Sequence, residues 1–598
     1  MDKKGGWKRF HRLKFDGKKM SRNARNAEIA STKHAHRFVL KKLSNLTQVR
    51  QNITAWLLIV TALIGAVIIQ SAWYRSSYTS ESPVSGGAYA EAMVGTIDTL
   101  NPLFATNEAE YSASKLLFSS LYDYDGTGHL RKDLATGMDL NAEKDTYTVT
   151  LRDDAKWHDG KKVTAEDVVF TVGLMKNPET RSPLLRSWSG VTATIVDAQT
   201  VQFKLGGPLA SFSDALTFSV LPRHILGDVE PTNIRENSFG ISPVGSGPFS
   251  FRLLQTIQTE RARKVAYLNA NSNYYRGIPK LDSFEIHAYK NNSGLIEAAR
   301  TRDVTSVVDI SAEQAQKLPK AFESQSIALN SGVYALFNTS NGVLKDAKVR
   351  KALQLATDTD VVRKVTSPDS NPLNLPFVST QIENRDLNVT KPALNPAKAK
   401  ALLKQAGWRL NDDGVLAKKK VVLSLRVVLN QDADYRRAVQ ELKRQWTDLG
   451  IKVTVLDFKA SASGQGFAQS VLQPREYDVL VNELTIGADP DVFAYWHSSQ
   501  ADSSGLNFSN YNNPIADDAL LSARLRSEQD LRDEKYKSFA RQWLRDAPAL
   551  GLYQSSARYA SSTQSNSVRK SDATPSLKDR YSNILNWTAQ NSQVYKTP

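Results

Sequence analysis

Cysteine is absent from this 598-residue sequence. Its absence excludes disulfides, thiolate metal ligands, a cysteine nucleophile and a lipid-modified cysteine as membrane anchor. Histidine spacing typical of metal sites is missing too, because the five histidines beyond residue 100 show no i, i+4 or His-x3–5-His pattern. We therefore expect no cofactor and no preformed metal site.

The body of the chain also lacks an excess of charge of one sign. The net charge is +16, but the first 50 residues, with 15 Lys/Arg and 3 Asp/Glu, contribute +12 of it. The remaining 548 residues carry only +4. A nucleic-acid-binding face needs clustered basic residues, so we predict no nucleic-acid partner for the body.

One long apolar run stands out after the basic tail. Residues 53–74 contain no charged side chain, and about 20 such residues span a bilayer as a helix. Trp56 and Trp73 lie near its ends, where amphipathic rings favour the membrane interface. The positive charge predicts a cytoplasmic tail over 1–52, an uncleaved transmembrane signal anchor over 53–74, and an extracytoplasmic body. A cleavable signal peptide is less favoured, because its charged region would be some 50 residues long and no small-x-small site follows closely.

Residues 75–85 are rich in serine and include proline, which predicts a flexible linker. Strand and helix patterns then alternate over about 500 residues, which indicates a mixed α/β architecture, and no 20–50-residue repeat is seen. The expected strands are 88–94, 146–151, 200–205, 281–288, 334–337, 421–429 and 477–481. The expected helices are 111–121, 165–174, 349–356, 396–406, 435–449 and 516–525.

Two local patterns resemble catalytic motifs but are better explained as structure. Asp159-Gly160 is a turn dipeptide and Thr164 a helix N-cap, so His158 beside Asp159 does not indicate an acid–base pair. The stretch from Val244 to Phe249 (VGSGPF) lacks the Lys-Ser/Thr ending of a phosphate loop and precedes a strand-like run. We predict no catalytic residue and no enzymatic activity.

Several segments together resemble the family-5 extracellular solute-binding proteins, the oligopeptide-, dipeptide- and nickel-binding receptors of ABC importers. The strongest match runs from Leu151 to Phe170 (LRDDAKWHDGKKVTAEDVVF). The other matches follow in the family's order over nearly the whole body: 98–102 (DTLNP), 243–249, 271–282, 346–353, 395–407, 487–491 and 506–514.

This resemblance implies a periplasmic-binding-protein-like fold of two α/β lobes, with an extra subdomain in the first lobe. Lobe I would then comprise 86–332 and 553–598, and lobe II would comprise 333–552. The implied function is that of a receptor that captures a peptide by hinge closure and delivers it to ABC permease subunits. Closure requires a ligand that contacts both lobes.

The resemblance also implies ligand-binding residues. Asp489 stands where peptide-binding relatives place an aspartate that pairs with the ligand's amino terminus, although an aspartate before Pro490 also suits the N-cap of a helix. Thr485 and Gly487 would offer backbone groups to an extended peptide, and Asn507 and Tyr553 would line the cleft. The chain departs from the family where peptide binders often have tryptophan, three residues before Asp489, because an isoleucine occupies that position.

Other ligands and roles remain open at this point. The same receptor could take a nickel chelate, haem or an oligosaccharide, or it could sense a ligand without transporting it. An oligosaccharide site would need aromatic platforms, and the sequence does not place the candidates Trp188, Trp408, Trp446 and Trp496.

Overall fold

The structure is a computed structural model that describes residues 33, 50–258, 262–340, 342–378, 381, 389–430, 432–458, 466–569 and 574–595. The chain divides into two compact units, one of Met1–Ser82 with Ser592–Pro598 and one of Pro83–Asn591. The basic tail expected over 1–52 lies almost entirely outside the described residues.

The smaller unit contains helix α3 (Arg50–Tyr78). Within it, Ile53–Tyr74 is the single helical stretch among the described residues that is long and apolar enough to cross a membrane. Its side chains are exposed on all sides of the helix, as expected of a segment that requires an apolar solvent. The apolar character of this helix agrees with the predicted anchor.

The flexible linker predicted over 75–85 is a misprediction. Helix α3 continues to Tyr78, and strand β1 (Thr79–Val84) follows it directly. Strand β1 pairs with β21 (Gln590–Tyr595) in a two-stranded sheet. Local composition cannot reveal a strand whose partner lies about 500 residues away, and the chain's last strand therefore does not belong to lobe I, where it was expected.

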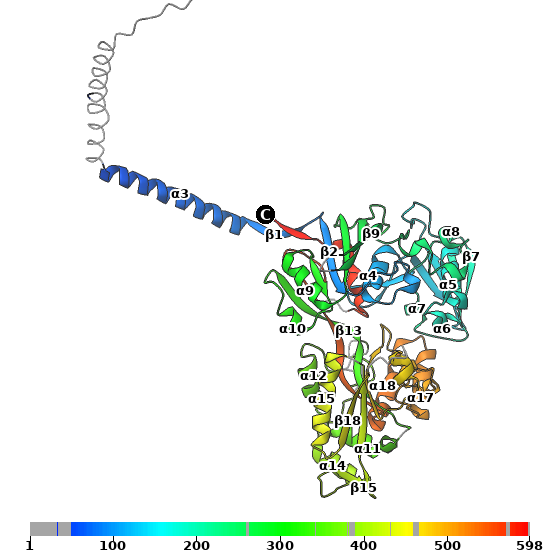
Figure 1. Ribbon diagram of the computed structural model, residues 1–598. Helices are drawn as coiled ribbons and strands as arrows, with labels where there is room; N and C mark the ends of the chain where they lie inside the picture. The colour runs from blue at the N-terminus through cyan, green and yellow to red at the C-terminus, as the bar shows by residue number, and fades with distance from the viewer. Residues whose placement is uncertain are drawn as a thin grey trace, which may run out of the picture. The chain divides into compact units, whose positions relative to one another are not determined.

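A ten-stranded sheet runs through the larger unit (Figure 1). In spatial order its strands are β18 (Lys452–Asp457), β17 (Ser424–Leu429), β19 (Val479–Thr485), β13 (Phe322–Phe337), β20 (Ala549–Ser562), β12 (Ser306–Val308), β2 (Ala88–Val94), β11 (Ser283–Tyr289), β10 (Arg263–Ala270) and β9 (Phe249–Ile257).

Two pairs of apolar cores divide this unit into two lobes. We call the part built around Tyr89, Phe284 and Val307 lobe I, and the part built around Val333, Trp446 and Trp496 lobe II. Lobe I also holds a four-stranded sheet, a strand pair and helices: β5 (Ala135–Leu140), β6 (Thr146–Leu151), β8 (Thr200–Lys204), β7 (Thr192–Asp197), β3 (Tyr122–Tyr124), β4 (Leu130–Lys132), α4 (Glu108–Leu117), α5 (Ala165–Lys176), α6 (Leu185–Trp188), α7 (Phe212–Ala215), α8 (Arg223–Leu226), α9 (Asn292–Thr301) and α10 (Ala312–Ala315).

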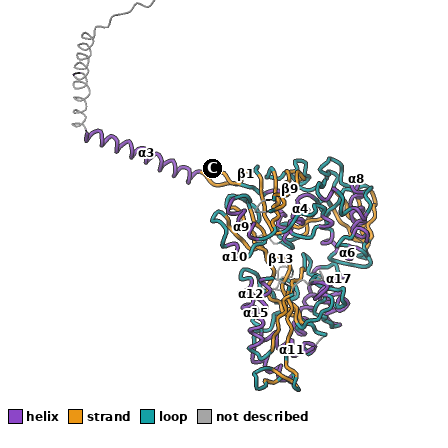
Figure 2. Tube along the Cα trace, in the orientation of Figure 1, coloured by secondary structure: helices purple, strands orange, loops and turns teal. Residues whose placement is uncertain are grey.

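Lobe II places its strands between two layers of helices. Figure 2 shows α12 and α15 on one side of the strands and α17 on the other. Its elements beyond the large sheet are α11 (Ala347–Ala356), α12 (Thr359–Thr366), α14 (Pro396–Gln405), α15 (Ala433–Thr447), α16 (Phe493–Trp496), α17 (Pro514–Leu525), α18 (Gln529–Asp546) and the strands β14 (Arg409–Leu410), β15 (Leu416–Lys418) and β16 (Val421–Val422).

The long strands β13 and β20 pass from one lobe to the other. They pair antiparallel in both lobes, but the register breaks between Ala328 and Gly332 and again after Val333. Gln554 bridges the break, because its side chain donates to the carbonyl of Leu329 (2.9 Å). The expected lobe boundaries, 332/333 and 552/553, fall within these two strands.

Several local predictions are confirmed: two strands, one helix cap and two turns. Strands β2 and β6 have the expected bounds, and Thr164 forms a capping box with Asp167 at the start of α5. Gly160 has a φ of +91° in the expected turn. The VGSGPF stretch is a close-packing turn, since a Cβ at Gly245 would lie 1.8 Å from the carbonyl oxygen of Leu117.

Candidate functional site at the lobe junction

Asp489 lies in lobe II on the segment that follows β19. Its Oδ1 accepts a hydrogen bond from Nη2 of Arg532 on α18 (2.7 Å), and both side chains are nearly buried, at 13% and 6% exposure. Asp489 is not a helix N-cap, because α16 begins only at Phe493 and the amide of Phe493 is bonded by Asp491 instead (3.2 Å). The carboxylate of Asp489 is therefore held in place by its ion pair with the guanidinium of Arg532.

A second carboxylate in lobe I faces this ion pair. Asp214 accepts a hydrogen bond from the hydroxyl of Tyr124 (2.9 Å), and its charge acts on Asp489 across the junction. Burial raises the pKa of Asp489 to about 6, against the lowering effect of Arg532, and burial also raises the pKa of Asp214. Arg532 is bonded to Asp489, and its charge also acts on Asp214, so the two carboxylates together favour an additional cation at the junction.

The other predicted ligand residues are already engaged in this conformation. Thr485 ends β19, and its carbonyl accepts a hydrogen bond from the Tyr495 hydroxyl (2.5 Å). The N–H of Gly487 donates to Asn330 (3.1 Å), and its carbonyl accepts from the Gln381 side chain (2.7 Å). Each of the two carbonyls keeps one further acceptor position, whereas the N–H of Gly487 already has its partner in Asn330.

Asn507 and Tyr553 differ from the expectation that they line an open cleft. The side chain of Asn507 is fully buried and bonds three main-chain groups, of His497 and Tyr511. This residue therefore holds its own loop together. Tyr553 is 4% exposed and packs in the core of lobe II.

The two lobes contact each other along a polar rim near Asp489. Ser211 of lobe I donates to Asp491 of lobe II (3.1 Å), and Arg524 holds the same carboxylate oxygen (2.8 Å). Arg186 donates to the carbonyl of Ser504 (2.9 Å). These contacts are the kind of inter-lobe bonds that form or break when a hinge moves.

A cavity of about 350 Å³ in lobe I adjoins this rim. Leu184, Ser187 and Phe218 help line it, together with Tyr111 and Trp188. Leu184 and Ser187 lie within two residues of Arg186, which contacts lobe II. The cavity therefore offers apolar volume next to the charged junction.

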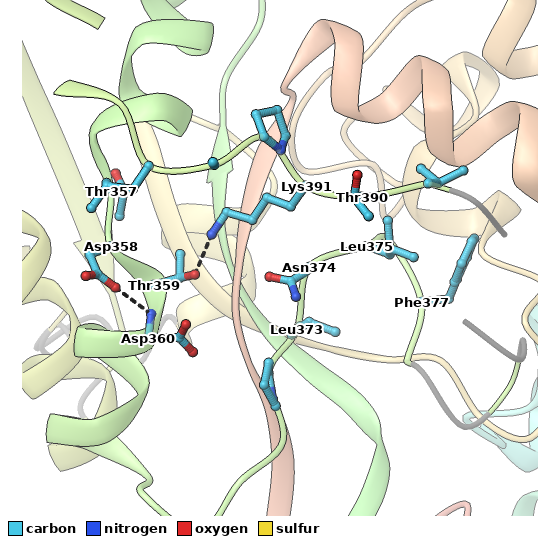
Figure 3. A pocket seen from close by; sticks show the side chains of 15 residues that line it. Thr357, Asp358, Thr359, Asp360, Leu373, Asn374, Leu375, Phe377, Thr390 and Lys391 are labelled. Atoms are coloured by element: carbon cyan, nitrogen blue, oxygen red, sulfur yellow. Dashed lines mark hydrogen bonds between the residues drawn. The ribbon is translucent and has the colours of Figure 1, made fainter. Parts of the chain in front are cut away.

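A second cavity, of about 550 Å³, lies in lobe II (Figure 3). Its polar side chains form hydrogen bonds at the start of α12: Asp358 accepts from the amide of Asp360 (3.1 Å), and Lys391 donates to Thr359 (2.5 Å). Burial lowers the pKa of Lys391. Because these groups satisfy one another, this cavity is a weaker candidate for ligand binding than the junction.

Comparison with known proteins agrees with this architecture. Residues 129–505, well over half of the chain, match the sequence profile described as bacterial extracellular solute-binding proteins, family 5 Middle. The chain belongs to this family. It is a solute-binding protein of mixed α/β fold, as the sequence motifs predicted.

Individual relatives cover most of the chain. The oligopeptide-binding protein AppA of Bacillus subtilis is 27% identical over 525 residues, which are 84% of this chain and 93% of AppA. The structure of AppA in complex with a nonapeptide has a TM-score of 0.67 at 26% identity and covers 85% of this chain and 99% of its own. The structure of NikZ from Campylobacter jejuni in complex with Ni(L-His), at 24% identity and a TM-score of 0.68, covers 84% of this chain and 99% of its own, and supports the fold.

Sequence reasoning missed the partners of Asp489. Arg532 follows it by 43 residues in an ordinary charged helix, and Tyr124 and Asp214 come from lobe I. No spacing rule links these positions, because only the folding of the two lobes brings them together.

Proposed function

We propose that this chain is a membrane-anchored, extracytoplasmic receptor that captures peptides between its lobes and delivers them to the permease of an ABC importer. The observation that carries the proposal is Asp489, a nearly buried carboxylate that faces lobe I. The charge of Arg532 acts on both Asp489 and Asp214, which leaves negative charge for the ammonium at the start of a peptide. The family and the relatives named for oligopeptides support this assignment.

Capture follows from the charges at the junction. An ammonium bound near Asp489 and Asp214 contacts both lobes at once, and such a ligand favours the state in which the lobes are together. A contact between unit charges at about 4 Å is worth up to about 4 kcal/mol at an effective dielectric constant near 20, before desolvation is subtracted. Binding and release involve no covalent change of the peptide.

Two further features support parts of the proposal. The apolar stretch of α3 supports a single-pass anchor, and the 15 Lys/Arg of the first 50 residues support a cytoplasmic amino terminus. Trp188, Trp408, Trp446 and Trp496 are all at most 7% exposed, so these four rings offer no stacking platform to an oligosaccharide. A peptide therefore suits the junction better than a sugar. We also propose lobe limits of 86–332 with 553–591, and 333–552.

The test is mass spectrometry of solutes extracted from the full-length chain purified in detergent, followed by thermal-shift screening with mixed short peptides. We expect co-purified peptides and a peptide-dependent rise in melting temperature that N-acetylation of the peptides weakens. Recovery of a sugar, haem or metal chelate with no response to peptides would overturn the peptide assignment. Deletion of the gene separates transport from sensing, because a receptor for transport is needed for growth on peptides.

A further inference from the structure

The cavity of about 350 Å³ in lobe I is lined mainly by apolar and aromatic side chains. Two of its rings are accessible: Phe218, beyond α7, is half-buried, and Tyr111 of α4 is 39% exposed. Trp188 of α6 supports Phe218 from within the lobe, because the two rings pack edge to face with 5.0 Å between their centroids, a favoured aromatic geometry. The cavity therefore presents two ordered aromatic rings to an occupant.

The charged groups on the lining of this cavity are cations. Among the described residues that line it, two are lysines and none is acidic. Lys115 pairs with Asp123 and lies 3.6 Å from Asp579, so its charge is balanced. The ammonium of Lys578 instead lies over the ring of Tyr111, 5.9 Å from its centroid, and no carboxylate of the described chain forms an ion pair with it. The lining therefore carries one positive charge that no carboxylate balances.

Helix α7 links the cavity to the junction where Asp489 lies. Ala215, the last residue of α7, lines the cavity. Its neighbour Asp214 is the carboxylate of lobe I whose charge acts on Asp489, and it is bonded by Tyr124. Adjacent Cα atoms lie about 3.8 Å apart, so an ammonium bound at Asp214 is close to the edge of the cavity.

Lobe II meets lobe I at the helices that contribute to this lining. Figure 1 shows α6 and α7 at the edge of lobe I next to α17. The N–H of Ala210, just before α7, donates to the carbonyl of Arg524 in α17 (2.9 Å). Arg186 of α6 donates to the carbonyl of Ser504 (2.9 Å). Contact between the lobes therefore shields a side chain in the cavity from water, which is the condition under which apolar surface stabilises a complex.

The volume and the lining define the chemistry of the occupant. Ligand pockets commonly measure about 300–1,000 Å³, so a cavity of about 350 Å³ suits one large side chain rather than a whole peptide. An aromatic side chain would contact the rings of Phe218 and Tyr111, and its face attracts an ammonium such as that of Lys578. A lysine or arginine side chain would lose its hydration and meet a like charge.

We propose that this cavity is a specificity pocket that takes one aromatic side chain from the start of a captured peptide and disfavours lysine or arginine there. This inference rests on the proposed capture of peptides at Asp489. The first three residues of an extended peptide span only about 10 Å, and Ala215 adjoins the carboxylate of Asp214. The side chain in the pocket is therefore that of the first, second or third residue.

The experiment is a positional scan of peptide affinity with the full-length protein in detergent. Alanine pentapeptides carry one phenylalanine, norleucine or lysine at position one, two or three, and binding is measured by isothermal titration calorimetry. At one position we expect phenylalanine to bind at least about tenfold more tightly than alanine, because its ring leaves water. Lysine should bind more weakly there than norleucine, which has a similar length but no charge.

Variants then assign the preference to the cavity. Ser187 is exposed at its rim, so Ser187→Trp fills the space and should reduce the phenylalanine-to-alanine ratio toward one. Ser189→Trp is the matched control, because Ser189 is also exposed but does not line the cavity, and it should keep the ratio. Lys578→Met should reduce the norleucine-to-lysine ratio toward one, because it removes the like charge.

Each part of the proposal has an outcome that overturns it. A phenylalanine-to-alanine ratio near one at every position in the unaltered protein, or a ratio that Ser187→Trp preserves, would overturn the pocket. An equal loss in both tryptophan variants would overturn its assignment to this cavity. An unchanged norleucine-to-lysine ratio in Lys578→Met would overturn the role of that ammonium. Failure of every peptide to bind would instead refute the proposed function itself.

Discussion

The affinity for peptides should depend on pH through Asp489. Burial raises its pKa from an ordinary 3.8 to about 6, so the side chain of the empty site is mostly protonated at pH 5 and mostly ionised at pH 7. A peptide ammonium favours the ionised form and therefore lowers the pKa when it binds. For a site with a free pKa of about 6 and a bound pKa well below 5, affinity falls about tenfold between pH 7 and pH 5.

Asp489→Asn removes the charge while keeping the shape of the side chain. At pH 7 we expect it to weaken peptide binding by about ten- to a hundredfold, since a hydrogen bond to a charged group is worth about 1.5–3 kcal/mol. The variant should also lose the pH dependence. Isothermal titration calorimetry of one neutral peptide and its N-acetylated form, at pH 5, 6 and 7, measures both effects, and the acetylated peptide should show a flat profile in either protein.

Stability without peptide gives an independent check on the same group. A carboxyl whose pKa is higher in the folded than in the unfolded state contributes stability that is present below about pH 3.8 and is lost as pH rises through 6. The change from 3.8 to about 6 corresponds to about 3 kcal/mol at most, and Asp489→Asn should remove this pH-dependent component. Equal affinity at pH 5 and pH 7, or an unchanged slope in Asp489→Asn, would refute the assigned role.

Three further substitutions test an inter-lobe hydrogen bond, a buried ion network and the close packing of a glycine. Asp491→Asn should weaken peptide binding about three- to tenfold in calorimetry without a large change in melting temperature, because the single amide oxygen cannot accept both from the amide of Phe493 and from Ser211 across the lobes; equal binding would show that the contact to Ser211 does not contribute to closure. Arg580→Met leaves two glutamates without their buried cation and should cost about 3–5 kcal/mol in urea unfolding, whereas a loss below about 1 kcal/mol would contradict a buried ion network. Gly551→Ala should destabilise by about 1–3 kcal/mol, because the new Cβ would lie 2.4 Å from a backbone carbonyl of the loop beside β20. The matched control Gly173→Ala, in the middle of α5 with open space around it, should instead stabilise the chain.

The local elements could be predicted because their causes are local. The alternation of Thr146–Leu151 and the cap at Thr164 depend on side chains within a few residues of one another, and both were placed correctly. The failure at 75–85 has the opposite cause, since β1 depends on a partner from the end of the chain. Family motifs in the right order were sufficient to predict the class of protein and its two-lobed architecture.

The candidate site could likewise be predicted only in part. Asp489 was singled out from the sequence, and its binding role stays a prediction, but no sequence pattern indicates that Arg532 pairs with it or that Asp214 acts on it from the other lobe. Sequence by itself determined the apolar span over 53–74, the α/β elements and the family, because hydrophobic pattern and short-range capping act along the chain. Only the tertiary structure decided which charges share a buried junction, because a pKa and an ion pair depend on distances that two folded lobes set.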